Sequence, residues 1–121
     1  VYSQHGGINQ GPVWINHNIV MNLDRAFVWK NEGIAENIYI YHNIVECANA
    51  GDRAASILDT YHGDKIKNWV VKNNVFICPK DQPRKLFQDK GGAGKSMAFA
   101  SNLCVNVTDT PEGTITGKDP E

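Results

Sequence analysis

Trp29, Asp59 and Asp89 are evenly spaced along the chain. In a chain that coils with this period, with neighbouring coils paired as parallel strands about 4.8 Å apart, the two aspartates would lie on adjacent coils. Two carboxylates at that distance repel each other, so one of them would hold its proton or the pair would bind a cation. Two solvated aspartates, or aspartates that cap turns, are the alternative interpretation.

The segment around Asp59 contains further residues suited to acid–base chemistry. The sequence DTYHGDK places Tyr61 and His62 directly after Asp59 and Thr60. Removal of a proton next to a uronate carboxylate needs a base, such as His, Lys or Tyr, and a cation, such as Ca²⁺ or Arg, that neutralises the carboxylate. Hydrolysis of a glycosidic bond instead needs two carboxyl groups, about 5–5.5 Å apart in a retaining enzyme and about 6.5–9.5 Å apart in an inverting one.

Two groups of candidate residues follow from these requirements. Trp29 would stack on a sugar ring. His5 lies one coil before Lys30 at a nearly equivalent position, which suggests a polar cluster of His5, Lys30 and Glu32. The predicted catalytic residues are Asp59, Asp89, His62 and Lys30, and the predicted substrate-binding residues are Trp29, Tyr61, Glu32 and His5. No metal-ligand set is predicted, and Ca²⁺ is left open as a cofactor.

A nine-residue pattern, which would position these residues, occurs four times in the chain. The copies are WINHNIVMN, YIYHNIVEC, VVKNNVFIC and AFASNLCVN. Their central asparagines are Asn18, Asn43, Asn74 and Asn102, so the first interval between copies is the shortest and the second is the longest. Uneven spacing excludes a repeat of fixed length, such as ankyrin, and is typical of a coil whose loops vary in length.

Apolar residues alternate with other residues in each copy. The side chains three and five residues before the asparagine, and one residue after it, are apolar in every copy, as in Ile38, Ile40 and Ile44. This period-two alternation predicts strands whose apolar side chains fill a shared interior. The asparagine is predicted to form a corner in the left-handed conformation and to hydrogen-bond to the asparagine of the next coil.

Further apolar segments, RAFVWKN, ASILDTY and RKLFQDK, predict a second or third strand in each coil. The fold class that follows is an all-β parallel solenoid of about four coils over residues 1–107. A polar exit segment is predicted over residues 108–121.

The copies VWINHNIVMN, IYIYHNIVEC and WVVKNNVFIC resemble the right-handed parallel β-helix proteins of the pectate-lyase-like superfamily. The resemblance covers about residues 10–107 and rests on core and corner positions. It implies right-handed coils, a polysaccharide substrate and a secreted, periplasmic or cell-surface location. Because neither end resembles the cap that closes a solenoid, we expect the chain to be part of a larger β-helix protein.

The composition argues against a nucleic-acid partner and against a membrane-surface role. The chain has 121 residues, of which 12 are basic and 13 acidic, and a net charge of −1 at pH 7. Nucleic-acid binders and membrane-surface proteins usually carry a basic excess, and the apolar runs are too short to cross a bilayer. We therefore expect neither a nucleic-acid partner nor a membrane span.

Three smaller motifs have more than one interpretation. His17 and His42 precede their asparagines at equivalent positions, where they would either share a metal ion or hydrogen-bond the corner. Cys47 and Cys78 both follow their asparagines by four residues, which fits a disulfide between coils or a pair of buried thiols. The loop DKGGAGKS lacks the first glycine of a phosphate-binding loop and precedes a predicted strand, so it is interpreted as a turn.

Two functional hypotheses follow. The first is a polysaccharide lyase or glycoside hydrolase, or part of one, that holds its polymer in a groove along the strands. The second is a non-catalytic solenoid that binds carbohydrate or serves as an adhesin or stalk. Mutation of Asp59 and Asp89 distinguishes them, because only the enzyme would lose turnover.

Overall fold

The computed structural model describes residues 2–4, 12–23, 27–30, 33–47, 56–60, 63–88, 93–111 and 114–117. In these ranges the protein consists of strands and loops with two short 3₁₀ helices, η1 (Gly63–Lys65) and η2 (Ala93–Ser96), and no α-helix. The predicted all-β class is therefore confirmed for the described part of the chain.

The strands form three sheets in which every pairing is parallel. Sheet A contains β1 (Tyr2–Gln4), β4 (Phe27–Lys30), β7 (Ser56–Thr60), β10 (Arg84–Gln88) and β13 (Val107–Thr108) in that order. Sheet B contains β2 (Val13–Asn16), β5 (Ala35–Tyr41), β8 (Ile66–Lys72) and β11 (Met97–Ala100). Sheet C contains β3 (Ile19–Leu23), β6 (Ile44–Cys47), β9 (Val75–Ile77), β12 (Leu103–Val105) and β14 (Ile115–Gly117).

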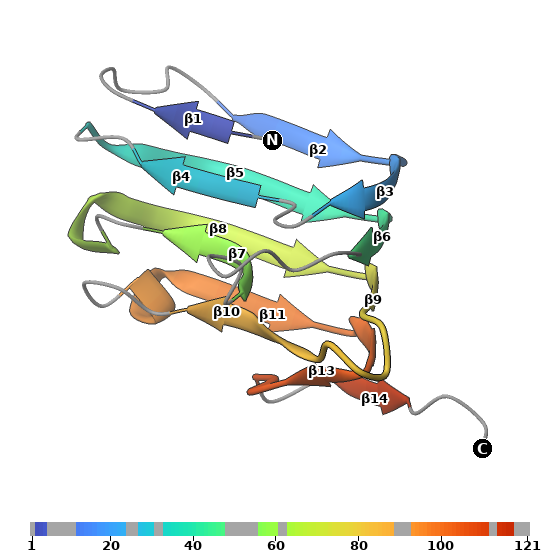
Figure 1. The fold of residues 1–121 in the computed structure, drawn as a ribbon. Helices are drawn as coiled ribbons and strands as arrows, with labels where there is room; N and C mark the ends of the chain where they lie inside the picture. The colour runs from blue at the N-terminus through green and yellow to red at the C-terminus, as the bar shows by residue number, and fades with distance from the viewer. Residues whose placement is uncertain are drawn as a thin grey trace.

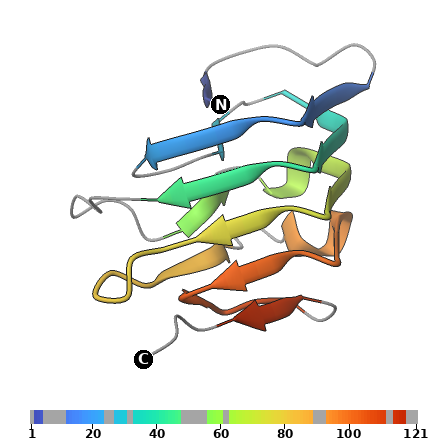
Figure 2. The same cartoon turned by 90° about the vertical axis from the view of Figure 1, so that its right-hand side faces the viewer.

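The chain passes through the three sheets in a fixed order. Strands β1, β2 and β3 lie in sheets A, B and C, and β4–β6, β7–β9 and β10–β12 repeat this order. We call these four passes coils 1 to 4; they are stacked from the N-terminal to the C-terminal end (Figure 1). Strands β13 and β14, the latter within the predicted exit segment, continue sheets A and C, and Figure 2 views the stack from the side of sheet C. This arrangement is compatible with the predicted β-helix.

The interior contains the apolar positions that precede each asparagine. Ile38, Ile40, Trp69 and Val71 are buried, and their equivalents in the outer coils pack against them. This part of the alternation pattern is confirmed. The rest of the buried apolar core consists of Phe27, Ala35, Val45, Cys47, Ile57, Leu58, Ile66, Phe76, Cys78, Leu86 and Cys104.

The apolar residue that follows each asparagine does not lie in the interior, so this part of the prediction is wrong. Ile19 is 71% exposed, and Ile44 and Leu103 are also exposed. The asparagines before Ile44 and Leu103, Asn43 and Asn102, are buried. Because side chains alternate along a strand, the residue after an inward-pointing asparagine must face outward.

The residue before each asparagine, rather than the asparagine itself, has the left-handed conformation. His17, His42, Asn73 and Ser101 have φ of 55°, 55°, 56° and 52°. The prediction that the asparagine itself takes the left-handed conformation is therefore wrong, and the corner residue is the one before it. The turn at the preceding residue directs the asparagine side chain inward, and Asn and His are among the residues that tolerate this conformation best.

The asparagines form a continuous hydrogen-bonded ladder, as predicted. The Nδ2 groups of Asn18, Asn43 and Asn74 donate to the Oδ1 atom of the asparagine in the next coil, at 3.0, 2.9 and 2.9 Å. The backbone N–H groups of the same three residues donate to the same oxygen atoms at 3.0–3.1 Å. Each Oδ1 of Asn43, Asn74 and Asn102 thus accepts two hydrogen bonds from the coil before it.

The ladder also satisfies backbone carbonyls at the corners. The Nδ2 groups of Asn43, Asn74 and Asn102 donate to the carbonyl oxygens of Ile15, Ile40 and Val71, all in the preceding coil, at 2.8–2.9 Å. Buried backbone carbonyls without partners are costly. Each asparagine therefore fixes the position of one coil relative to its neighbours.

Replacement of Asn74 by alanine is expected to lower the free energy of unfolding by at least about 3 kcal/mol, because it leaves several buried partners without hydrogen bonds, each costing about 1–3 kcal/mol. Asn18→Ala, at the exposed end of the same ladder, should cost about 1 kcal/mol or less. Urea denaturation of both variants measures the difference. Equal losses would contradict the role assigned to the ladder.

Candidate functional site

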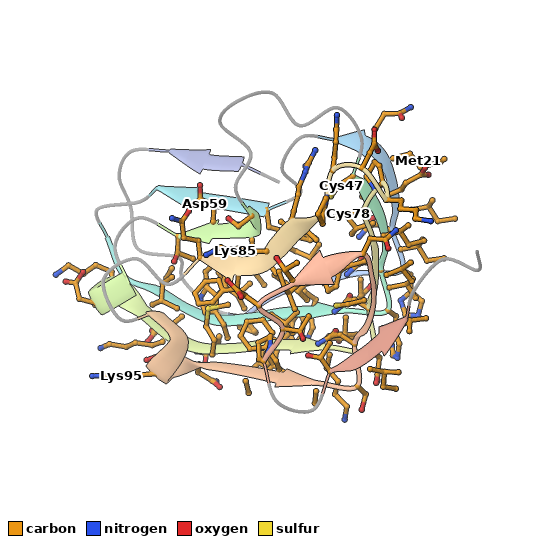
Figure 3. The ribbon with its side chains drawn as sticks, turned by 60° about the horizontal axis from the view of Figure 1, so that its bottom comes forward. Met21, Cys47, Asp59, Cys78, Lys85 and Lys95 are labelled. Atoms are coloured by element: carbon orange, nitrogen blue, oxygen red, sulfur yellow. The ribbon has the colours of Figure 1, made fainter. Side chains whose placement is uncertain are left out.

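Most of the predicted catalytic and binding residues lie outside the described part of the chain. Asp89, His62, Tyr61, Glu32 and His5 are in this group. Trp29 and Lys30 belong to β4, of which the backbone pairing is described. Asp59 is the candidate whose side chain is described, and it lies on β7 (Figure 3).

The predicted column of Trp29, Asp59 and Asp89 is wrong by one residue. Asp59 pairs with Val28 on one side and with Gln88 on the other, and Trp29 pairs with Thr60. In sheet A, paired residues of coils 2 and 3 are therefore one residue further apart in the sequence than Trp29 and Asp59 are. Asn43 and Asn74 have the same, longer separation. The even spacing of the three predicted residues thus does not follow the true register.

Asp59 is not a solvated surface residue. It is 4% exposed and lies between Leu58 and Thr60, which are also buried. Aspartate is seldom fully buried unless it has a polar partner. The structure therefore overturns the interpretation of Asp59 as a solvated carboxylate.

His17 and His42 lie at the exposed corners between sheets B and C. Their ring centroids are 5.1 Å apart, and His42 Nε2 lies 3.4 Å from Asn73 Nδ2. Their left-handed backbone shows that both are corner residues. Within the described residues no group of three or more His, Cys, Asp or Glu side chains is placed to bind a metal ion.

The outer face of sheet B carries aromatic side chains that the sequence interpretation did not select. Trp14, 56% exposed, stacks on Tyr39 with ring centroids 5.8 Å apart and an interplanar angle of 23°. Tyr41 contacts His42 edge-on at 5.3 Å. We call Trp14, Tyr39, Tyr41, His17 and His42 the aromatic patch.

Backbone register brings the members of the aromatic patch together. Trp14 pairs with Tyr39 across β2 and β5, and both alternate with the interior residues of their strands. In coils 3 and 4 the positions equivalent to Trp14 are Val70 and Ala98, so the aromatic side chains are confined to coils 1 and 2. The same period-two alternation that identified the core assigns Trp14, Tyr39 and Tyr41 to the outer face, so the sequence did contain the signal for these three residues.

The aromatic patch combines apolar ring surface with hydrogen-bonding groups. Tyrosine and tryptophan present large rigid rings together with a polar atom. Asn68 Nδ2 lies 3.4 Å from the Tyr39 hydroxyl, and Asn16 Oδ1 lies 3.2 Å from His17 Nδ1. Next to Tyr41 on the neighbouring strand is the exposed Lys72. Such a surface can stack on sugar rings and hydrogen-bond to their hydroxyl groups.

The outer face of sheet C has a different character. A row of aliphatic residues runs in register along its five strands: Ile19, Ile44, Val75, Leu103 and Ile115. Met21, also exposed, projects from the same sheet (Figure 3). A contiguous exposed apolar surface typically marks a site of interaction.

Three cysteines lie in the interior behind sheet C, and all three are free thiols. Burial raises the pKa of Cys104 to about 12. Cys47 and Cys78 are hydrogen-bonded to each other, which raises the pKa of Cys47 and lowers the pKa of Cys78. The buried Arg84 also favours the Cys78 thiolate through its backbone N–H group and its positive charge. The predicted buried thiols are thus confirmed.

Comparisons of the chain with protein-family models, with curated proteins and with solved structures found no match. None of the helices in the described ranges is long and apolar enough to span a membrane.

The raised pKa of Cys104 predicts a loss of stability at alkaline pH. An unfolded thiol ionises near its ordinary pKa of 9.0, whereas folded Cys104 keeps its proton up to about pH 12. The contribution of this thiol is therefore fully present below pH 9 and is lost between pH 9 and 12, by at most about 1.4 kcal/mol per pH unit. Urea denaturation at increasing pH measures this slope. The Cys104→Val variant should show a shallower slope, and an identical slope would exclude this effect.

Proposed function

We propose that this chain is part of a right-handed parallel β-helix that binds a polysaccharide across the aromatic patch of sheet B. The repeated order of sheets A, B and C with parallel pairing supports the β-helix, and right-handed crossover is the general rule for parallel strands. The resemblance of the asparagine-centred repeats to the pectate-lyase-like superfamily supports the same fold. It also supports a secreted, periplasmic or cell-surface location.

The observation that carries the proposal is the exposed stack of Trp14 on Tyr39. Large aromatic side chains on an outer sheet face expose apolar area that a packed core would otherwise bury. Ring surfaces flanked by hydroxyl, amide and imidazole groups suit the mixed apolar and hydroxylated faces of a sugar. Because strands repeat about every 4.8 Å, such a face offers evenly spaced contacts to a polymer.

Charge near the aromatic patch favours an acidic polysaccharide over a neutral one. Lys72 lies beside Tyr41 on the next strand, and its side chain is exposed. A lysine next to an aromatic platform would pair with a uronate carboxylate while the ring contacts the sugar. Pairs of this kind at an exposed site contribute modestly and weaken as salt concentration rises.

Trp14→Ala and Tyr39→Ala are each expected to weaken polysaccharide binding roughly tenfold, which corresponds to the loss of one aromatic contact of about 1.4 kcal/mol. Ile19→Ala, an exposed apolar residue of coil 1 on sheet C, is the matched control and should leave binding unchanged. Affinity electrophoresis through uronate and neutral polymers measures the effect. Equal weakening by all three variants, or no binding by the unmodified protein to any polymer, would refute the proposal.

Degradation of the polymer is the second candidate function. It is supported by the resemblance to the pectate-lyase-like superfamily, and Asp59 is the predicted catalytic residue whose side chain is described. The Asp59→Asn variant keeps the shape of the side chain and removes its carboxyl group. If Asp59 acts in catalysis, turnover on uronate polymers should fall at least a hundredfold while the melting temperature changes by only a few degrees. Absorbance at ultraviolet wavelengths follows elimination, and release of reducing ends follows hydrolysis. Retained turnover would remove Asp59 from the catalytic site.

A further inference from the structure

Cys47 and Cys78 occupy equivalent positions on neighbouring coils. Cys47 is the last residue of β6, and Cys78 directly follows β9. The preceding residues, Glu46 and Ile77, are paired in the parallel ladder. The register therefore places the two cysteines side by side, as Figure 3 shows.

The two side chains meet in the interior. Cys47 and Cys78 are 0% and 1% exposed, and their thiol groups are hydrogen-bonded to each other. Parallel neighbours have Cα atoms about 4.8 Å apart. Disulfide-bonded cysteines have Cα atoms about 4.4–6.8 Å apart, so the backbone spacing already suits a covalent bond.

The neighbouring groups favour reaction at Cys78. The backbone N–H group of Arg84 donates a hydrogen bond to the Cys78 sulfur, and the Arg84 guanidinium contacts Cys47. Arg84 is itself buried, so its charge acts at short range with little solvent screening. Such an environment stabilises the thiolate, which is the nucleophile in thiol–disulfide exchange.

Cys104 is not positioned as an alternative partner. It pairs with Phe76, two residues before Cys78. The segment of coil 4 that lies beside Cys78 is that of Val105 and Asn106, as shown by the hydrogen bonds from Cys78 N to Val105 O at 3.0 Å and from Asn106 Nδ2 to Cys78 O at 3.0 Å. Cys104 therefore lies diagonally across the ladder from Cys78.

We propose that Cys47 and Cys78 form a disulfide bond between coils 2 and 3 when the chain folds in an oxidising environment, and that Cys104 stays a free thiol. With glutathione disulfide as oxidant, the Cys78 thiolate attacks one glutathione sulfur and displaces a glutathione thiolate. The Cys47 thiolate then attacks the Cys78 sulfur and displaces the second. The cysteines lose two electrons and two protons, and glutathione disulfide gains them as two molecules of glutathione.

The bond would form during folding, when coil 3 pairs with coil 2 and before the interior closes around the two sulfur atoms. It would close a loop that runs from Cys47 to Cys78 and therefore comprises one full coil of the chain. Cross-links that close a loop of this size stabilise a protein, chiefly by restricting the unfolded chain. The proposal does not depend on the polysaccharide-binding function.

The test is to refold the reduced, denatured full chain in a glutathione redox buffer and, in parallel, under dithiothreitol. After alkylation in denaturant, mass spectrometry should find one modified cysteine in the first sample and three in the second. Peptide mapping should find a peptide from each of coils 2 and 3 joined through Cys47 and Cys78. The oxidised protein should melt several degrees above the reduced protein.

Two variants sharpen the assignment. Cys104→Ala should retain no free thiol after oxidative refolding, and Cys47→Ala should retain both remaining thiols. Three alkylated cysteines in the unmodified protein, a cross-linked peptide containing Cys104, or disulfide-linked dimers would each overturn the proposal. Peptide mapping of the unmodified protein decides the question even where a variant does not fold.

Discussion

The side-chain amide of one asparagine per coil sets the geometry on which the other features depend. The Oδ1 atoms of the two central asparagines, Asn43 and Asn74, each accept two hydrogen bonds from the preceding coil. Their Nδ2 groups donate to a backbone carbonyl of the preceding coil and to the Oδ1 atom of the next asparagine. A leucine of similar size would fill the volume but leave these backbone groups unpaired, at a cost of about 1–3 kcal/mol for each group. The ladder therefore determines where the strands of sheets B and C begin and end relative to one another.

The all-β class and the parallel stacking of the strands could be predicted from the sequence because their signals are local. The alternation around each asparagine predicts strands, and the recurrence of the asparagine predicts their stacking. The direction of each side chain was harder to predict, because a single left-handed residue reverses the alternation of inward and outward side chains. His42 does so immediately before Asn43, and Ile44 consequently faces solvent. A pattern that looks only for apolar residues assigns Ile44 to the core.

The candidate site was less predictable because its geometry depends on register. Even spacing suggested one column for Trp29 and Asp59, whereas sheet A pairs Trp29 with Thr60. Between coils 3 and 4 the interval also differs from sheet to sheet. Trp69 and its partner Met97 in sheet B are one residue closer in the sequence than Asp59 and its partner Gln88 in sheet A. The segment that connects sheet A to sheet B is therefore one residue longer in coil 3 than in coil 4. Loop lengths of this kind leave no periodic signal. The aromatic patch, in contrast, could have been found by listing the outward positions of the same strands.

All side-chain amides of the ladder point the same way along the stack. In each link the Nδ2 group donates one hydrogen bond forward, to the Oδ1 atom of the asparagine in the following coil. Hydrogen bonds aligned in series polarise one another, so a central link is stronger than the same link in isolation. The column of asparagines thus has a direction and gains strength with length, as a chain of aligned dipoles does. An added coil of this sequence pattern would bind more tightly to a long stack than to a short one.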